Sequence, residues 1–106
     1  MGYGFGGGFG GGNMQQLMRQ AQKIQQQMQQ AREQLDQEEF VGSSGGGMVE
    51  VTMFGNKTLK KVAINPKVVD PDDVEMLEDL IISAFNDVLA KIEIAEKERI
   101  PQIPGM

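Results

Sequence analysis

The side chains that could do chemistry in this sequence are carboxylates, amines, guanidinium groups and hydroxyls. The 106 residues contain no cysteine and no histidine, which excludes disulfides, zinc fingers, thiol nucleophiles and acid–base catalysis by imidazole. The acidic run Asp70-Pro71-Asp72-Asp73 is typical of a helix start and lacks the glycine and closing glutamate of a calcium loop. The run Gly45-Gly46-Gly47 lacks the lysine and hydroxyl that end a phosphate-binding loop. We therefore expect no enzyme, no metal site, no cofactor and no small-molecule substrate.

Basic side chains are the remaining candidates, and they are grouped along the chain. The sequence has 10 lysines and arginines against 15 acidic residues, a net charge of −5. This balance excludes a general basic field that would attract nucleic acid or anionic lipid. Residues 1–32 nevertheless contain bases and no acid, and so do residues 55–67. Any contact with a polyanion must therefore be local.

A long helix is predicted to carry the first basic group. Its apolar residues recur at alternating intervals of three and four, the spacing of a coiled-coil seam. The seam comprises Met14, Leu17, Ala21, Ile24 and Met28, followed at the same spacing by Ala31 and Leu35. Asn13 is the predicted N-cap. So narrow a seam usually meets another helix, and a second copy of the chain is its simplest source, so we predict a homodimer.

Arg19 and Lys23 fall on the face of this helix opposite the seam. A two-fold dimer would present both residues twice, and they could contact phosphates without reading bases. The simpler interpretation is that these cations only keep the helix soluble, and charge alone favours that interpretation.

The middle of the chain is predicted to form an antiparallel sheet of two or three strands. A short strand can open at Phe40 and Val41, and Met48 to Phe54 alternate apolar and polar residues, the period of a half-buried strand. Gly55-Asn56 is a two-residue hairpin signal, with a positive φ expected at the glycine. The second strand is predicted to end near Ile64.

The hairpin would place the second group of bases on its second strand. The register that follows from a two-residue turn puts Glu50 opposite Lys61 and Val49 opposite Val62, which pairs acid with base and apolar with apolar. Lys60 and Lys61 are candidates for phosphate contact from charge, although Lys61 could instead only pair with Glu50.

A second long helix is predicted after the sheet, with Asp70 as its N-cap and Pro71 as its first residue. Asp87 and Lys91 form an i,i+4 ion pair on it. Its apolar stripe suits packing on a sheet, and comprises Val74, Leu77, Ile81, Ala84, Val88, Ile92 and Ala95, widened by Leu80, Phe85 and Leu89. The order of helix, antiparallel strands and helix predicts a two-layer α+β fold.

Composition predicts three parts of the chain. Residues 1–12 read as a disordered tail of glycine and aromatic residues, residues 13–100 as a single domain, and residues 101–106 as a short C-terminal tail. No apolar run approaches the ~18 residues of a membrane span, and the N-terminus lacks the basic start and apolar core of a secretory signal. We therefore expect a cytoplasmic protein without a membrane partner.

The residues described above resemble the YbaB/EbfC family of bacterial nucleoid-associated proteins from about Asn13 to Ile100. The order and spacing of several segments together carry the resemblance. These segments are Met14-Gln15-Gln16-Leu17-Met18, Gly45-x-Gly47-x-Val49-x-Val51, Val62-x-Ile64-x-Pro66, Met76-Leu77-Glu78-Asp79-Leu80-Ile81 and Ala84-Phe85-Asn86-Asp87. The extended glycine-rich N-terminus departs from the family pattern.

The resemblance implies a tweezers-shaped homodimer that binds double-stranded DNA in the nucleoid without catalysis. Because the long helices of this family are implicated in DNA contact, the resemblance makes Arg19 and Lys23 candidate DNA contacts, followed by Arg32. We expect DNA binding of low sequence specificity, and a role in organising the chromosome and in affecting gene expression. The alternative is a dimeric interaction scaffold for a recombination or replication protein, in which DNA contact is incidental.

Overall fold

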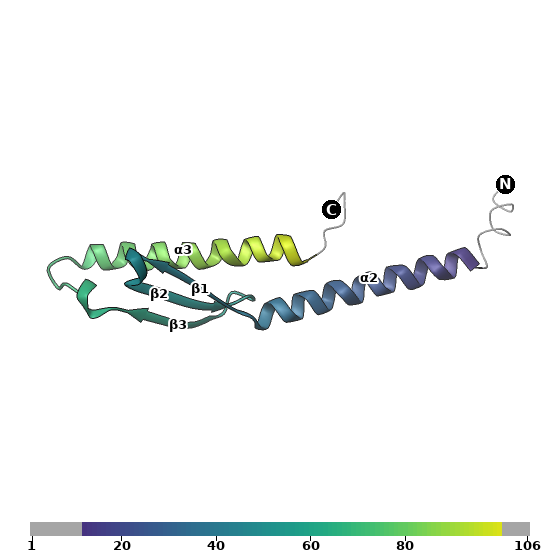
Figure 1. Cartoon of the computed structure of the whole chain (residues 1–106), viewed down its shortest axis with the longest axis horizontal. Coiled ribbons are helices and arrows are strands. Elements are labelled where there is room, and N and C mark those ends of the chain that lie inside the picture. Colours follow the sequence, from purple (N-terminus) through teal and green to yellow (C-terminus); the bar gives the residue numbers. More distant parts are fainter. Residues whose placement is uncertain (1–11, 101–106) are drawn as a thin grey trace.

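The computed structural model describes residues 12–100 of the chain, which form two long helices and a three-stranded sheet (Figure 1). The elements in chain order are α2 (Gly12–Gln37), β1 (Glu39–Ser44), the 3₁₀ turn η1 (Gly45–Gly47), β2 (Val49–Phe54), β3 (Leu59–Ile64), the 3₁₀ turn η2 (Pro66–Val68) and α3 (Val74–Arg99). This order confirms the predicted α+β fold class. Apart from Gly12, the tails predicted over residues 1–12 and 101–106 lie outside the described residues.

Helix α2 projects from one end of the sheet, whereas α3 lies along it (Figure 1). The molecule is therefore elongated, with principal-axis extents of 79 × 22 × 17 Å. Glutamine, methionine, leucine and alanine are good helix formers, and they continue α2 from Gly12 to Gln37. Asn13 lies inside this helix because Gly12 before it is already helical, so the prediction of Asn13 as the N-cap is wrong.

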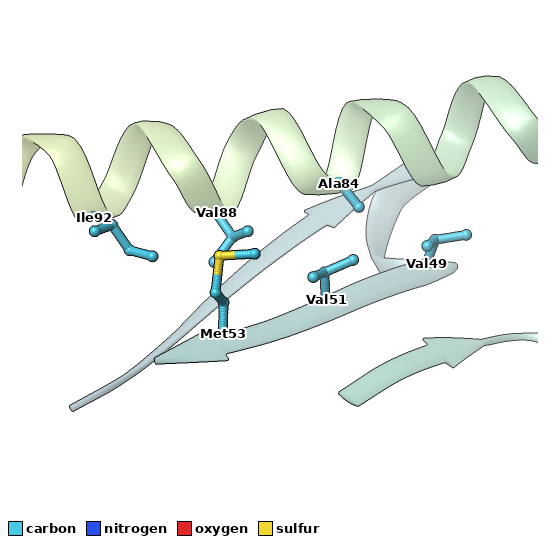
Figure 2. Packing of buried hydrophobic residues seen from close by; sticks show 6 residues of the cluster. All are labelled: Val49, Val51, Met53, Ala84, Val88 and Ile92. Atoms are coloured by element: carbon cyan, nitrogen blue, oxygen red, sulfur yellow. The ribbon is translucent and has the colours of Figure 1, made fainter. Parts of the chain in front are cut away.

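The hydrophobic core lies between one face of the sheet and α3. The three strands are antiparallel in the order β1-β2-β3. Figure 2 shows alternate side chains of β2 pointing at α3, as the period-2 pattern predicted. The buried cluster consists of Val49, Val51, Met53, Ala84, Val88 and Ile92. Val74 and Leu89, predicted on the same helical stripe, are instead 55% and 37% exposed.

The register of the β2–β3 hairpin differs from the prediction by two residues. Glu50 lies opposite Ala63, and Thr52 lies opposite Lys61. The connection holds four residues, 55–58, rather than two, which moves every pair along the strand. The wrong predicted pairs are Glu50 with Lys61 and Val49 with Val62.

The four-residue connection has a different backbone conformation from a two-residue turn. The positive φ, 68°, falls on Lys57, and the predicted positive φ at Gly55 is wrong. Gly55 is needed for another reason, because a Cβ there would lie 1.8 Å from the carbonyl oxygen of Leu35. Leu35 is 1% exposed, so the last turns of α2 are held tightly against the hairpin.

Helix α3 begins at Val74 rather than at Pro71, so the prediction of Asp70 as N-cap is wrong. The N-cap is Asp73, whose carboxylate accepts a hydrogen bond of 3.2 Å from the backbone N–H three residues on. The Asp70 carboxylate instead accepts from the N–H of Asp72 at 2.9 Å. An aspartate before a proline readily closes such a local turn, and this turn delays the helix.

Side chains of α3 close the outer edge of β1. The Asp87 carboxylate accepts a hydrogen bond of 2.9 Å from the N–H of Ser43, and the Lys91 ammonium donates one of 2.9 Å to the carbonyl of Val41. Asp87 and Lys91 are also 3.3 Å apart, which confirms the predicted i,i+4 ion pair. Two of the backbone groups that β1 turns away from β2, the N–H of Ser43 and the carbonyl of Val41, therefore have partners on α3.

This edge contact predicts an acid-dependent contribution to stability. The hydrogen bond from the Ser43 N–H, helped by Lys91 and opposed by desolvation, lowers the pKa of Asp87 below its usual 3.8. Because the folded pKa lies below the unfolded one, the contribution is present above about pH 4 and is lost as the pH falls through the folded pKa. Asp87→Asn is expected to remove this part of the acid dependence, measured as urea midpoints at about pH 7 and about pH 3. Equal losses in both proteins would contradict the assignment.

Candidate nucleic-acid interface

The cations of the described residues fall into two groups. Four have no acidic partner within 4.0 Å anywhere in residues 12–100, namely Arg19, Lys23, Lys61 and Lys67. Six pair with carboxylates, namely Arg32, Lys57, Lys60, Lys91, Lys97 and Arg99. An unpaired, exposed cation is the more available for a phosphate, since it breaks no ion pair on binding.

Arg19 and Lys23 are exposed on the part of α2 that projects beyond the sheet (Figure 1). They are four residues apart, which places them on one face of the helix. No acidic residue precedes Glu33 in the chain, so their positive potential is not cancelled within the arm. The structure therefore presents both as a small cationic patch on a helix surface.

Arg32, the third residue predicted on this helix, is engaged inside the chain. Its guanidinium lies 2.9 Å from a carboxylate oxygen of Asp36 and 2.6 Å from one of Glu96. The hydrogen bond to Glu96 is the main cause that raises the pKa of Arg32 above its usual value. Arg32 therefore connects the C-terminal part of α2 to α3 through this ion pair.

The two lysines predicted on β3 differ from each other. Lys60 forms an ion pair with Glu39 of β1, and its ammonium lies 5.9 Å from the ring centroid of Phe54. Lys61 is exposed opposite Thr52, so it does not make the predicted pair with Glu50. Lys61 is the more available of the two.

One chain does not gather all five predicted residues into one patch. Arg19 and Lys23 lie on the projecting arm, whereas Lys60 and Lys61 lie on the sheet (Figure 1). The sequence analysis missed Lys67, an exposed cation in η2 without an acidic partner in the described chain. Its position in residues 55–67, which contain no acid, was the sequence signal that could have made Lys67 a candidate.

The predicted seam of α2 is largely uncovered in a single chain. Met14, Leu17 and Ile24 are 50%, 59% and 47% exposed, Ala21 is exposed, and only Met28 is half-buried. The α2 arm thus carries an apolar stripe on one face and the Arg19–Lys23 patch on the opposite face.

The acidic residues at the start of α3 line an open hollow of about 380 Å³ formed by Asp73, Glu75, Met76, Asp79, Leu80 and Ser83. Within residues 12–100, no three acidic side chains are grouped closely enough to hold a metal ion. Neither helix of that region is both long and apolar enough to cross a membrane.

The fold and these cations define a small α+β protein that presents a basic patch on a projecting helical arm. Residues 10–106 match the sequence model of the YbaB/EbfC DNA-binding family, so the chain belongs to this family, as the resemblance predicted.

Several curated bacterial relatives carry the description nucleoid-associated protein. One from Lachnospira eligens is 49% identical over 68% of this chain and 62% of its own length, and one from Paramagnetospirillum magneticum is 56% identical over 60% of each. The matched region therefore spans less than two thirds of these two relatives. A relative from Listeria monocytogenes is 46% identical over 68% of this chain and 74% of its own length.

A solved structure supports the fold. The crystal structure of the uncharacterized protein HP0035 from Helicobacter pylori superposes with a TM-score of 0.67 at 25% sequence identity. The match covers 82% of this chain and 91% of that protein.

Proposed function

We propose that this protein binds double-stranded DNA as a nucleoid-associated homodimer. It helps to organise the chromosome and thereby affects gene expression. The observation that carries the proposal is the Arg19–Lys23 patch on the acid-free, projecting part of α2, in a chain of a DNA-binding family. Relatives described as nucleoid-associated support the nucleoid as its location.

Two chains make this contact stronger than one. A dimer presents the Arg19–Lys23 patch twice, and two arms in a tweezers-like arrangement would reach phosphates at separate points of a duplex. The uncovered apolar stripe of α2 supports association, because such a stripe usually meets another helix. The proposed phosphate contacts are Arg19 and Lys23, with Lys61 and Lys67 as further cations that have no acidic partner in residues 12–100. Arg32 and Lys60 are occupied by carboxylates.

The net charge limits how the dimer can bind. Twice the chain's −5 gives −10, so the distant field of the dimer repels DNA. The cations must act within a Debye length of about 8 Å at physiological salt. Contacts to phosphates carry no direct sequence information, so discrimination between sequences is expected to be low and to come from DNA shape.

The salt dependence of DNA binding tests this function. If Arg19 and Lys23 of both chains contact phosphates, there are four contacts, and log Kd is expected to rise with log salt concentration with a slope of about 3.6. Eight contacts, with Lys61 and Lys67 included, would give about 7. The measurement is fluorescence anisotropy of a random-sequence duplex from about 25 to about 200 mM salt.

A slope near zero, or no binding in dilute buffer, would contradict the proposal. In that case the interaction-scaffold alternative would be favoured if one stoichiometric protein partner were recovered by the pure chain.

A further inference from the structure

Helix α2 packs on the rest of the chain near its C-terminal end. Residues 13–27 are all exposed in a single chain, and Met28 is the first half-buried side chain of the described helix. These exposed residues form the α2 arm, which carries the Arg19–Lys23 patch and projects beyond the sheet (Figure 1). The direction of the arm therefore depends on the contacts made by the last turns of α2.

One attachment lies at the end of the helix. Leu35 is 1% exposed, and its carbonyl oxygen packs against Gly55 in the connection between β2 and β3. The N–H of Gly55 donates a hydrogen bond of 2.9 Å to the carbonyl of Glu38, whose carboxylate pairs with Arg99 of α3. These contacts hold residues 35–38 in place. A rod that is held near one end can still tilt about that point, so they do not by themselves fix a direction.

A second attachment lies one turn further along α2 and reaches a different element. The Arg32 guanidinium donates a hydrogen bond of 2.6 Å to the carboxylate of Glu96 on α3. The two side chains are 41% and 22% exposed, and such a charge-assisted bond is stronger where it is partly shielded from water. Lys57 lies 3.9 Å from the other oxygen of Glu96, so Arg32 is its principal partner. Attachments at two points and on two elements fix the direction of a helix.

Distance from this base magnifies any change in direction. Arg19 lies sixteen residues before Leu35, which is about 24 Å along a helix that rises about 1.5 Å per residue. A tilt of about 10° about Leu35 therefore moves Arg19 by about 4 Å. This movement exceeds the length of an N–H···O hydrogen bond, about 2.9 Å. The patch can meet phosphates at their fixed spacing only while the direction of the arm is held.

We propose that the Arg32–Glu96 ion pair positions the Arg19–Lys23 patch for DNA by fixing the direction of the α2 arm. Arg32 and Glu96 are positioning residues, which act through the arm and touch no phosphate themselves. This inference rests on the proposed function and deepens it, because it assigns residues that control the DNA contact from a distance.

Spin labels test the direction of the arm without DNA. Because the chain contains no cysteine, Gln20→Cys on the arm and Ala90→Cys on α3 provide two label sites, both of them exposed. Pulsed electron double resonance measures the distribution of distances between the labels, in labelled chain diluted with unlabelled chain. Glu96→Ala is expected to broaden this distribution by about 4 Å, the movement produced by a tilt of about 10°.

A matched control removes the same charge from the same helix. Glu93→Ala lies three residues before Glu96 and breaks only the i,i+4 pair with Lys97 within α3. Alanine is a good helix former at both positions. The control is expected to leave the distance distribution unchanged, and circular dichroism checks that each variant remains folded.

DNA affinity tests the consequence for binding. An apparent Kd rises as the inverse of the population of the competent state. If each released arm keeps its productive direction for about half of the time, both arms of a dimer do so for about a quarter, and Kd rises about fourfold. The slope of log Kd against log salt is expected to stay near 3.6, because no phosphate contact is removed.

Two variants separate this effect from net charge. Removing Arg32 changes the chain from −5 to −6, and removing Glu96 changes it from −5 to −4. Arg32→Ala and Glu96→Ala are nevertheless both expected to weaken binding about fourfold. The double variant is expected to bind no more weakly than either single variant, since both remove one shared interaction. Glu93→Ala, which also gives −4, is expected to bind at least as tightly as the original chain.

The opposite role for Arg32 gives opposite results. If Arg32 contacts a phosphate, Glu96→Ala releases it and tightens binding, and Arg32→Ala lowers the salt slope; either result would overturn the proposal. An unchanged distance distribution in Glu96→Ala would overturn it as well. If the original chain does not bind DNA, the proposed function and the role of the patch fail together, whereas a broadened distribution would still assign the direction of the arm to the ion pair.

Discussion

Replacing both Arg19 and Lys23 by glutamate is expected to weaken DNA binding by about 100-fold or more at about 100 mM salt. Four phosphate contacts per dimer would be lost, and about 0.7 kcal/mol for each contact corresponds to a 100-fold change. The slope of log Kd against log salt is expected to fall by about 3.6. Both side chains are exposed on α2, so the fold and the mass of the proposed dimer should not change. Anisotropy with a labelled duplex measures the loss.

A charge-matched control separates the position of the cations from net charge. Lys57→Glu with Lys97→Glu also changes the chain from −5 to −9, but Lys57 of the hairpin and Lys97 of α3 lie 3.9 and 3.5 Å from carboxylates of α3. This variant is expected to bind DNA with a much smaller loss. If both double variants weaken binding equally, the Arg19–Lys23 patch is not the contact.

Gly42→Ala is expected to destabilise the fold by about 3 kcal/mol or more. A Cβ at this position would lie 2.3 Å from the backbone N of Val88 and 2.4 Å from the backbone O of Ala84. Both atoms belong to the α3 backbone, so no side-chain rotation relieves the clash, and α3 must move away from β1. Such a movement opens the core between β2 and α3, and a loss of this size is a large part of the stability of a small domain.

Thermal unfolding followed by circular dichroism measures this effect, with an expected fall in Tm of about 12 °C or more. The control is Ser43→Ala on the next residue, whose side chain is exposed and whose backbone N–H keeps its bond to Asp87. The control is expected to stay within about 3 °C of the original Tm. A Gly42→Ala protein as stable as this control would show that β1 and α3 do not approach so closely.

The elements themselves were predictable because their signals are local. Alternation over Val49 to Met53 predicted a strand with one buried face, and three-four spacing predicted α3, whose Ala84, Val88 and Ile92 are buried. Predictions failed at element ends. Asp70 and Asn13 were both placed as helix caps, yet one closes a turn and the other lies within a helix, because several nearby residues could have filled each role.

The candidate site was predictable in part. The positions of Arg19 and Lys23 opposite the seam follow from helical periodicity, and both are exposed. The engagement of Arg32 was not predictable, because its partner Glu96 is 64 residues away in the chain. Lys60 likewise meets Glu39 across the sheet. Charge counts along the sequence cannot tell which cations such distant carboxylates occupy.

The sequence by itself determined the order of helix, strands and helix, the lack of thiol and imidazole chemistry, and the two opposite faces of α2. These properties depend on composition and on spacing within one element, where neighbours in sequence are neighbours in space. Only the tertiary structure decided the hairpin register and which strands of the sheet α3 covers. It did so because the carbonyl of Leu35 meets Gly55 at the base of α2, and because α3 covers two strands of three. Both depend on contacts between distant segments that no local pattern records.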